Sequence, residues 1–575
     1  MQPTADSSDI VLTVNNLSLD FDNGRSVVHA VKNVSFRMTR GKTLCLVGES
    51  GSGKSVTARS LMQIVDPAGR ITKGRTILSI DGKEIDITAL DPKGREVRRL
   101  RGARLGLVFQ EPMSALSPFH SIGDQIDEVI ELHLGLDKEA ARARTIELLR
   151  QVEIANPEAM ANRFSFEFSG GMRQRVCIAM ALACNPDILI ADEPTTALDV
   201  TTQAEILDLI KRLQIGRGMA MLLITHDMGI VAEVADEVAV MRRGEIVESG
   251  TVDQIFYDPK HPYTRQLLNA TLKLEHKSER RLATKQSEVM TAEPILSVRG
   301  LTKRYGDVKG FFGLSASEGF KAVDGVDLDL YPGENLGIVG ESGSGKTTVG
   351  RLILRIIEPT AGKVLYRPEN GERVDVATLT KSDLRRFHRE VRLIFQDPFA
   401  SLNPRMTVKQ IVGDPLYINH RGQGREREDR VAELMRLVGL DPAMMDRYPH
   451  AFSGGQRQRL GIARALALNP RIIIADEATS ALDVSIRSQI LDLMLDLQKR
   501  LGLSFIFISH DISVVRYFCD RVAVMHRGRI VETGDAEKIC TDPDEPYTRS
   551  LISAVPSPDP RNKRMLHRHR FGAYS

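Results

Sequence analysis

The 575-residue sequence lacks the features that would place it in a membrane or in an oxidising compartment. No run approaches the roughly 18 uninterrupted apolar residues that a transmembrane helix requires. The N-terminal MQPTADSSDI lacks the basic-then-apolar pattern of a secretory signal. No Cys-x-x-Cys pair occurs, so we expect reduced thiols in or near the core, with no disulfide or metal role, at Cys45, Cys177, Cys184, Cys519 and Cys540. These absences predict a cytoplasmic protein.

A strong charge bias is also missing. The formal net charge is +3, whereas a nucleic-acid binder more often shows a clearly basic domain. The hydrophobic share of 42% and the charged share of 27% are typical of a soluble globular protein that can build large cores. At one domain per ~150 residues this length would give about four domains, but a duplication revises that count.

The chain contains one long internal repeat. GESGSGKS at 48–55 returns as GESGSGKT at 340–347, and FSGGMRQR at 168–175 returns as FSGGQRQR at 452–459. FQEPMSALSP at 109–118 likewise matches FQDPFASLNP at 395–404. From the FSGG string onward the two copies keep a constant spacing of 284 residues, at Ser169 and Ser453, Glu193 and Glu477, His226 and His510, and Tyr263 and Tyr547. Two halves therefore share one plan.

The repeat predicts a first domain at 1–273, a linker at 274–294 and a second domain at 295–575. The linker LEHKSERRLATKQSEVMTAEP is rich in charge and poor in large apolar groups, which favours a solvated segment. In the second half, the aromatics of GFFGLSASEGF (310–320) either meet a partner or fold onto their own domain. Each half opens with strand-like alternation and later shows short buried strands, DILIAD and RIIIAD, which predicts an α/β fold with a parallel core.

Both Gly-rich segments fit the P-loop pattern, because each follows an apolar strand and precedes a plausible helix. Glycines let successive N–H groups converge on a phosphate, and Lys54 and Lys346 add a positive charge at the β- and γ-phosphates. The hydroxyls of Ser55 and Thr347 are expected to coordinate Mg²⁺. The alternative is a Gly-rich turn that binds nothing.

Adjacent carboxylates end the two buried strands. Asp192 and Asp476 are placed to hold Mg²⁺, while Glu193 and Glu477 are candidates for the general base that polarises the attacking water. Taken alone, such a pair is often a helix cap or a solvated turn. The P-loop upstream favours the functional interpretation.

Two further polar side chains follow apolar strands in each half. Gln110 and Gln396 can orient water and contact Mg²⁺, and His226 and His510 can hydrogen-bond the γ-phosphate and hold water and glutamate in line. A lone histidine at a strand end is usually structural. The recurrence of both histidines 33 residues after the glutamate favours a catalytic role.

The Ser-Gly-Gly strings predict loops that enter helices, because serine caps well and glycine permits a tight turn. Such a helix end presents free N–H groups and the positive pole of the dipole, and so favours an anion.

One series of motifs recurs in the same order in both halves and resembles that of the ATP-binding-cassette ATPases. It consists of the P-loop, the glutamine, the SGG string, the Asp-Glu strand, the Ala-Leu-Asp tripeptides (197–199 and 481–483) and the histidine. The resemblance spans nearly the whole chain. It implies two tandem P-loop NTPase domains, each with a parallel RecA-like core, an antiparallel β subdomain and a helical signature subdomain. It also implies that ATP and Mg²⁺ bind and that two cassettes pair head to tail within one chain, so that the SGG helix of one closes on the nucleotide of the other.

Carried over residue by residue, the resemblance implies two nucleotide sites. The first would use Gly48, Glu49, Ser50, Gly51, Ser52, Gly53, Lys54, Ser55, Val56, Gln110, Asp192, Glu193 and His226, closed by Ser453, Gly454 and Gly455. The second would use Gly340, Glu341, Ser342, Gly343, Ser344, Gly345, Lys346, Thr347, Thr348, Gln396, Asp476, Glu477 and His510, closed by Ser169, Gly170 and Gly171. Phe21 and Tyr305 would stack on adenine, although either is equally an ordinary strand aromatic.

The segments HPYTRQLL (261–268) and EPYTRSLI (545–552) are similar to those of dipeptide and oligopeptide import ATPases, including members for glutathione. This implies two transmembrane permease subunits, an extracytoplasmic solute-binding protein as an indirect partner, and a peripheral location on the cytoplasmic face of the inner membrane. No cysteine cluster follows either PYT segment, so we expect no iron–sulfur centre. The alternative is a soluble tandem-cassette ATPase that acts on ribosomes or nucleic acid. We expect the basic tail RNKRMLHRHR (561–570) to be a solvated terminus rather than a site for RNA or lipid.

Overall fold

The computed structural model describes residues 9–275, 293–306, 319–565 and 568–569, apart from residues 25, 197, 370, 398, 399 and 481. Most of the predicted linker (276–292), most of the aromatic segment 310–320, and the alanines of the two Ala-Leu-Asp tripeptides lie outside the described residues. The chain forms two compact units, the first from Met1–Thr271 with Pro556–Arg568 and the second from Leu272–Val555 with His569–Ser575.

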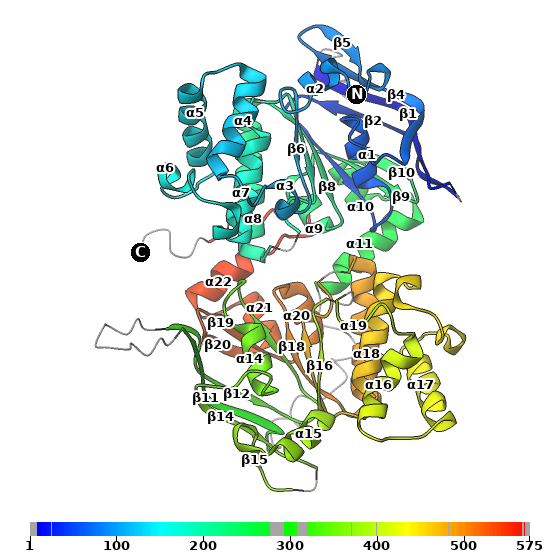
Figure 1. The fold of residues 1–575 in the computed structure, drawn as a ribbon, viewed down its shortest axis with the longest axis vertical. Coiled ribbons are helices and arrows are strands. Elements are labelled where there is room, and N and C mark those ends of the chain that lie inside the picture. The colour runs from blue at the N-terminus through cyan, green and yellow to red at the C-terminus, as the bar shows by residue number, and fades with distance from the viewer. Residues whose placement is uncertain are drawn as a thin grey trace. The chain divides into compact units, whose positions relative to one another are not determined.

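The first unit contains two sheets and a group of helices (Figure 1). Its strands are Ile10–Asp22 (β1), Val27–Thr39 (β2), Thr43–Val47 (β3), Gly69–Ile80 (β4), Lys83–Asp86 (β5), Leu105–Val108 (β6), Ile188–Asp192 (β7), Ala220–Thr225 (β8), Glu237–Arg242 (β9) and Glu245–Thr251 (β10). Its helices are Lys54–Leu61 (α1), Arg95–Leu100 (α2), Pro112–Ala115 (α3), Ile122–Leu134 (α4), Lys138–Gln151 (α5), Pro157–Met160 (α6), Gly170–Ala181 (α7), Val200–Arg217 (α8), Met228–Val234 (α9), Val252–Tyr257 (α10) and Pro262–Leu274 (α11), whose last turn belongs to the second unit. Short 3₁₀ turns lie at Ile87–Ala89 and Ser165–Glu167.

The second unit repeats this plan. Its strands are Leu296–Tyr305 (β11), Phe320–Leu330 (β12), Asn335–Val339 (β13), Ala361–Tyr366 (β14), Val374–Asp375 (β15), Val391–Ile394 (β16), Ile472–Asp476 (β17), Ser504–Ile508 (β18), Arg521–His526 (β19) and Arg529–Asp535 (β20). Its helices are Lys346–Ile353 (α14), Lys381–Glu390 (α15), Val408–Ile418 (α16), Arg425–Leu437 (α17), Gly454–Leu466 (α18), Val484–Leu501 (α19), Ile512–Phe518 (α20), Ala536–Thr541 (α21) and Pro546–Ser553 (α22). Its 3₁₀ turns lie at Val376–Thr378, Pro442–Met444 and Pro449–Ala451.

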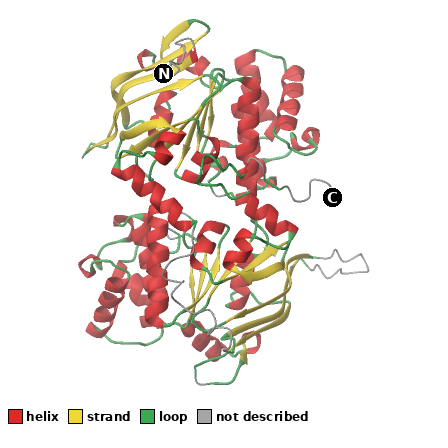
Figure 2. Ribbon diagram, turned by 180° about the vertical axis from the view of Figure 1, so that it is seen from behind, coloured by secondary structure: helices red, strands yellow, loops and turns green. Residues whose placement is uncertain are grey.

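The two sheets of each unit differ in character. The smaller sheet is antiparallel, with strand order β2-β1-β4-β5 in the first unit and β12-β11-β14-β15 in the second. The larger sheet has the order β6-β7-β8-β3-β9-β10, and β16-β17-β18-β13-β19-β20 in the second unit, and all its pairs are parallel except the last. Within each unit the strands gather on one side and most of the helices on the other (Figure 2). The predicted fold, a parallel core with an antiparallel and a helical subdomain, is confirmed.

Strands β3 and β13 lie centrally in their sheets and are buried at every residue, which explains why their sequences, TLCLV and NLGIV, carry so few polar side chains. A hydrophobic core joins the two sheets of the first unit with α1, and it includes Leu12 of β1, Leu46 of β3 and Leu61 of α1. The five cysteines are buried thiols outside any disulfide, as expected. Burial raises the pKa of the Cys177 and Cys540 thiols to about 12, which keeps both protonated at neutral pH.

The C-terminal segment packs onto the first unit. The backbone N–H groups of Ser557, Arg564 and Met565 all donate to one carboxylate oxygen of Glu233 in α9, at 3.0, 2.9 and 3.1 Å. Glu233 is 1% exposed and Met565 is fully buried. The expectation of a solvated terminus is therefore wrong for this part of the tail. An apolar side chain and a buried carboxylate that accepts backbone N–H groups supply the reason.

Candidate active site

The loop between β3 and α1 has a backbone that requires glycine at two points. Gly48 and Gly53 have φ angles of 153° and 102°, and the same pattern recurs at Gly340 and Gly345. A Cβ at Gly48 would lie 2.2 Å from the carbonyl oxygen of Met241 in β9. A Cβ at Gly53 would lie 2.6 Å from the carbonyl oxygen of Ala30 in β2, so any other residue at either point would displace the loop.

The lysine that begins each following helix folds back over its loop. Lys54 Nζ donates to the carbonyl oxygens of Gly48 and Glu49, at 2.7 and 2.9 Å. Lys346 Nζ makes the matching contacts, both at 2.7 Å. Each lysine is 5% exposed, so a largely desolvated ammonium lies beside the N–H groups of the loop. This arrangement favours an anion such as a phosphate.

A hydroxyl meets a carboxylate next to each loop. Ser55 Oγ donates to Asp192 Oδ1 at 2.8 Å, and Thr347 Oγ1 donates to Asp476 Oδ1 at 3.0 Å. Burial raises the pKa of both aspartates, while the hydroxyl hydrogen bonds lower it in part. A buried carboxylate beside a hydroxyl offers the hard oxygen ligands that Mg²⁺ prefers.

Three side chains donate to the carboxylate of Glu193, directly after β7. His226 Nδ1 lies 3.1 Å from Oε1, and Oε2 accepts from Gln110 Nε2 and from Thr196 Oγ1, both at 2.9 Å. Burial opposes ionisation, but the hydrogen bond and charge of His226, with Thr196 and Lys54, lower the pKa of Glu193 to about 2. The carboxylate is thus fixed in direction and ionised at neutral pH.

The second unit brings the equivalent residues together. His510 Nδ1 lies 3.2 Å from Glu477 Oε1, and Gln396 Nε2 donates to Oε2 at 2.7 Å. Burial again opposes ionisation, while His510 and Gln396 lower the pKa of Glu477. Both glutamates have a φ of 46°, and each donates its N–H to the strand beside it, to the carbonyl of Ile224 or of Ile508. The same unusual backbone turn presents both carboxylates.

The comparisons with known proteins decide the family. Residues 31–196 and 323–480 match the family model of the ABC transporter, and residues 247–297 and 531–570 match that of the Oligopeptide/dipeptide transporter C-terminal region. The glutathione import ATP-binding protein GsiA of Salmonella typhimurium is 48% identical and covers 97% of this chain and 91% of its own. GsiA of Escherichia coli K12 is 47% identical and covers 96% and 91%. The chain belongs to the ABC transporter ATP-binding proteins.

Solved cassettes are similar to parts of this ABC protein. The dimeric structure of a bacterial ABC transporter cassette is 32% identical, covers 42% of this chain and 98% of that chain, and aligns with a TM-score of 0.36. The family match in both halves confirms the predicted resemblance, and the chain is an ATP-binding ATPase of an ABC transporter. Within the described residues, each helix is too short or too polar to cross a bilayer.

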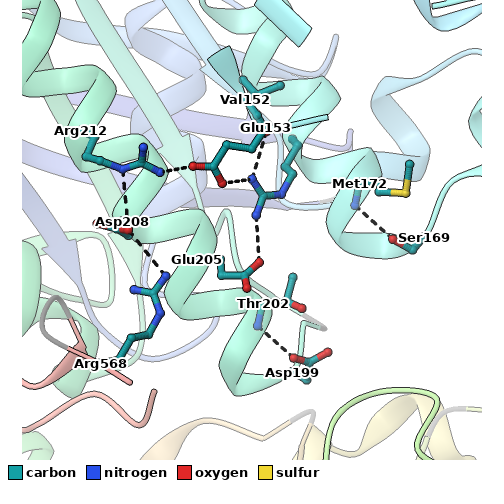
Figure 3. Close-up of polar contacts among 11 residues, drawn as sticks. Val152, Glu153, Ser169, Met172, Asp199, Thr202, Glu205, Asp208, Arg212 and Arg568 are labelled. Carbon is teal, nitrogen blue, oxygen red and sulfur yellow. Dashed lines mark hydrogen bonds and ion pairs between the residues drawn. The ribbon is translucent and has the colours of Figure 1, made fainter. Parts of the chain in front are cut away.

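The signature helices of this ABC protein begin where the SGG strings predict. Ser169 caps α7 by accepting the N–H of Met172 at 3.3 Å (Figure 3), and Ser453 caps α18 through Gln456 at 3.4 Å. A Cβ at Gly171 would lie 2.6 Å from the methyl group of Thr202 in α8, so glycine there permits close helix packing. Ser169 is exposed, which leaves the start of the helix accessible.

Ion pairs tie the first signature helix to its neighbours. Arg175, in α7, bridges Glu153 and Glu205 at 2.8 and 2.9 Å. Arg212 reaches Glu153 from α8, and Asp208 lies between Arg212 and Arg568 of the C-terminal segment (Figure 3). The signature helix is therefore fixed in direction by charged contacts on its flank.

The two predicted adenine-stacking residues differ in their surroundings. Phe21 is partly buried against the first core and pairs with Gly69 across the antiparallel sheet. Tyr305 is 43% exposed, and the Lys303 ammonium lies 5.3 Å from the centre of its ring. Stacking on adenine stays a prediction for both.

Sequence reasoning missed two sets of residues near these sites. Thr196 donates to the Glu193 carboxylate, whereas its counterpart Ser480 donates to the backbone carbonyl of Glu477 at 3.0 Å. Tyr263, in the first PYT segment, accepts the N–H of Glu49 in the P-loop. A hydroxyl three residues after each glutamate and a repeated tyrosine were visible in the sequence, but neither pattern indicates the bonding partner.

Proposed function

We propose that this ABC ATPase energises the uptake of peptides, either dipeptides and oligopeptides or a glutathione-like solute, through an importer. The observation that carries the proposal is the match of both halves to the oligopeptide/dipeptide transporter C-terminal region, together with relatives named for glutathione import that match along nearly their whole length. We further propose that two transmembrane permease subunits bind the chain on the cytoplasmic face of the inner membrane, and that an extracytoplasmic protein delivers the solute to them.

In the proposed reaction, the P-loop N–H groups and the lysine ammonium bind the phosphates of ATP. Glu193 and Glu477 orient the attacking water and accept its proton, and His226 and His510 hold each carboxylate in direction. The glutamine amide donates to the other carboxylate oxygen and so limits its rotation. The histidines and glutamines thus act by positioning a carboxylate that is already ionised.

The residues present fit a magnesium ion at each site. Ser55, Asp192 and the Gln110 amide oxygen supply oxygen ligands in the first site, and Thr347, Asp476 and Gln396 supply them in the second; the bonded hydroxyl–carboxylate pairs support this assignment. When bound, Mg²⁺ would neutralise charge on the β- and γ-phosphate oxygens.

We also propose that each nucleotide is shared by the two halves. The family resemblance supports this idea, as does the accessible start of the signature helix, which provides N–H groups and a helix dipole for an anion. Moving a two-state equilibrium from 1:99 to 99:1 requires ~5.5 kcal/mol of differential binding, which two bridging ATP molecules can provide. Hydrolysis would then remove the bridge and drive the permeases back.

Paired substitutions in the intact chain test the sharing. Lys54→Ala combined with Ser453→Arg damages the same shared pocket twice, so the ATPase rate should equal that of Lys54→Ala alone. Lys54→Ala combined with Ser169→Arg damages both pockets and should abolish turnover. The opposite ranking would show that each half hydrolyses ATP with its own signature serine.

The solute is tested by co-expression of the chain with its candidate permeases and binding protein in membrane vesicles. Addition of a dipeptide, an oligopeptide or glutathione to the loaded binding protein should stimulate ATP hydrolysis, and an unrelated sugar serves as the control. Co-purification with ribosomes and absence from the membranes would contradict the proposal.

A further inference from the structure

The two PYT segments place one tyrosine against each P-loop. Tyr263, in α11, is 2% exposed, and its hydroxyl accepts the backbone N–H of Glu49 at 3.0 Å. Tyr547, in α22, is 3% exposed and accepts the N–H of Glu341 at 3.2 Å. These contacts join residues 214 and 206 positions apart in the chain. Because the same contact occurs in both units, it is a regular feature of the cassette and not a chance contact.

The start of each PYT helix is fixed to the hairpin beside the P-loop. The Glu248 carboxylate, in β10, accepts the backbone N–H groups of Lys260 and His261 at 2.6 and 3.0 Å, directly before α11. The counterpart Glu532, in β20, accepts the N–H of Asp544 at 2.8 Å before α22. Each of these glutamates lies in an edge strand of the larger sheet, β10 or β20. The sheet therefore fixes where the PYT helix begins and where its tyrosine lies relative to the P-loop.

The tyrosine ring is covered by the last residue of the neighbouring strand. The Arg242 guanidinium lies 4.7 Å from the centre of the Tyr263 ring, in cation–π range. In the second unit the His526 ring takes this place, 4.1 Å from the Tyr547 ring. Each hydroxyl is thereby held at one position relative to the loop.

Glu49, whose N–H bonds the tyrosine, is also held through its carbonyl group. The Glu49 carbonyl accepts from Lys54 Nζ at 2.9 Å and from the N–H of Ser52 at 3.1 Å. Behind the loop, the carbonyl of Ser52 accepts the N–H of Gly244 at 2.9 Å. The tyrosine hydroxyl therefore bonds the same residue whose carbonyl sets the position of the phosphate-binding lysine.

We propose that Tyr263 and Tyr547 are positioning residues of the two ATPase sites. Each hydroxyl holds the N–H of the second P-loop residue, Glu49 or Glu341, so that the later loop N–H groups and the lysine keep one arrangement for the phosphates. The inference rests on the proposed phosphate-binding role of the P-loops. The regions that match the Oligopeptide/dipeptide transporter C-terminal region would then have a function inside the cassette, which is to hold the P-loop in position.

The test replaces both tyrosines by phenylalanine in the full chain, which keeps the rings and removes only the hydroxyls. Loss of the hydroxyl removes the hydrogen bond that holds this part-buried loop N–H, so we expect the KM for ATP to rise about ten-fold, equivalent to about 1.4 kcal/mol. The kcat at saturating ATP should change less than about three-fold, because the carboxylates are untouched. The rise in Tm that saturating ATP produces should shrink to match the weaker binding.

Tyr366→Phe is the matched control, because Tyr366 is also buried and its hydroxyl bonds Glu390 in the antiparallel part of the second unit. This variant should lower Tm without changing the KM for ATP. If the double variant behaves like this control, with a lower Tm and an unchanged KM, the tyrosines serve stability alone and the inference is wrong.

A second comparison separates this inference from the function on which it rests. A chain with both Lys54→Ala and Lys346→Ala should lose ATP turnover. Full turnover in that chain would overturn the assignment of the P-loops themselves. Loss of turnover there, with a normal KM in the tyrosine variants, would overturn only the positioning role.

Discussion

Glu193→Gln is the sharpest test of the proposed chemistry. The substitution keeps the size of the side chain and removes its charge and its capacity to accept a proton. The site tolerates the new amide, since its oxygen can still accept from Gln110 and Thr196 and its nitrogen can face His226. ATP binding should therefore persist while hydrolysis at this site fails.

The expected fall in ATP hydrolysis follows from the presence of two sites in one chain. Removal of a general base costs about 10²- to 10⁴-fold, so the altered site should retain at most about 1% of its rate. Glu477 has the same backbone turn and the same glutamine and histidine contacts, so the second site should continue. Phosphate release by the whole chain should then fall to about half, and Glu477→Gln combined with Glu193→Gln should abolish it.

The assay measures phosphate release at saturating ATP and Mg²⁺, together with the amount of ATP bound per chain. Glu158→Gln is the control, because this glutamate forms an exposed ion pair with Arg150 in the first unit. Unchanged hydrolysis in Glu193→Gln would refute the role of the base. Complete loss in Glu193→Gln alongside full activity in Glu477→Gln would show that the second site is idle.

Three further predictions concern the groups around these carboxylates. Thr196→Val removes one donor to Glu193 and should lower turnover several-fold in a chain whose second site is silenced, whereas Ser480→Ala, measured with the first site silenced, should change it less than about two-fold. The pKa of Glu193 is depressed from 4.5 to about 2, so its ionisation contributes stability that is complete above pH 4.5 and lost as the pH falls toward 2. As the pH is lowered through this range, the urea midpoint of unfolding should fall less steeply in Glu193→Gln than in the unaltered chain. Equal slopes in the two proteins would contradict the shift. Glu233→Ala leaves two buried N–H groups and one part-buried N–H group without their carboxylate and should lower Tm by several degrees, whereas an unchanged Tm in a calorimetric scan would show that the tail contacts contribute nothing to stability.

The sequence alone predicted the parts whose chemistry is local. The strand before Lys54 and the helix after it follow from apolar runs and glycines within a dozen residues, and the carboxylate at the end of β7 follows from DILIADE. The roles of Gln110 and His226 follow from their positions directly after apolar strands in both halves of the repeat. Each of these predictions depends on spacing that the α/β fold fixes.

The missed contacts depend on geometry that spacing does not fix. Thr196 reaches the carboxylate and Ser480 reaches a carbonyl, although the two residues occupy equivalent positions in the repeat. Tyr263 and Glu49 are 214 positions apart in the chain, and only the folded arrangement of the first unit brings them together. The composition of the tail predicts a solvated segment because basic residues dominate it, whereas the buried Met565 and the backbone N–H groups decide where its described part lies.

The differences between the two halves lie around the sites and not within them. Lysine, aspartate, glutamate, glutamine and histidine recur with nearly equal distances, while the supporting groups vary: Arg242 covers one tyrosine and His526 the other, and Thr196 binds a carboxylate where Ser480 does not. Groups of this kind change the direction and affinity of the side chains that they hold, and they supply no chemistry themselves. Any difference in ATP turnover between the two sites should therefore be caused by these supporting residues. Thr196→Ser combined with Ser480→Thr should then reverse which site is faster.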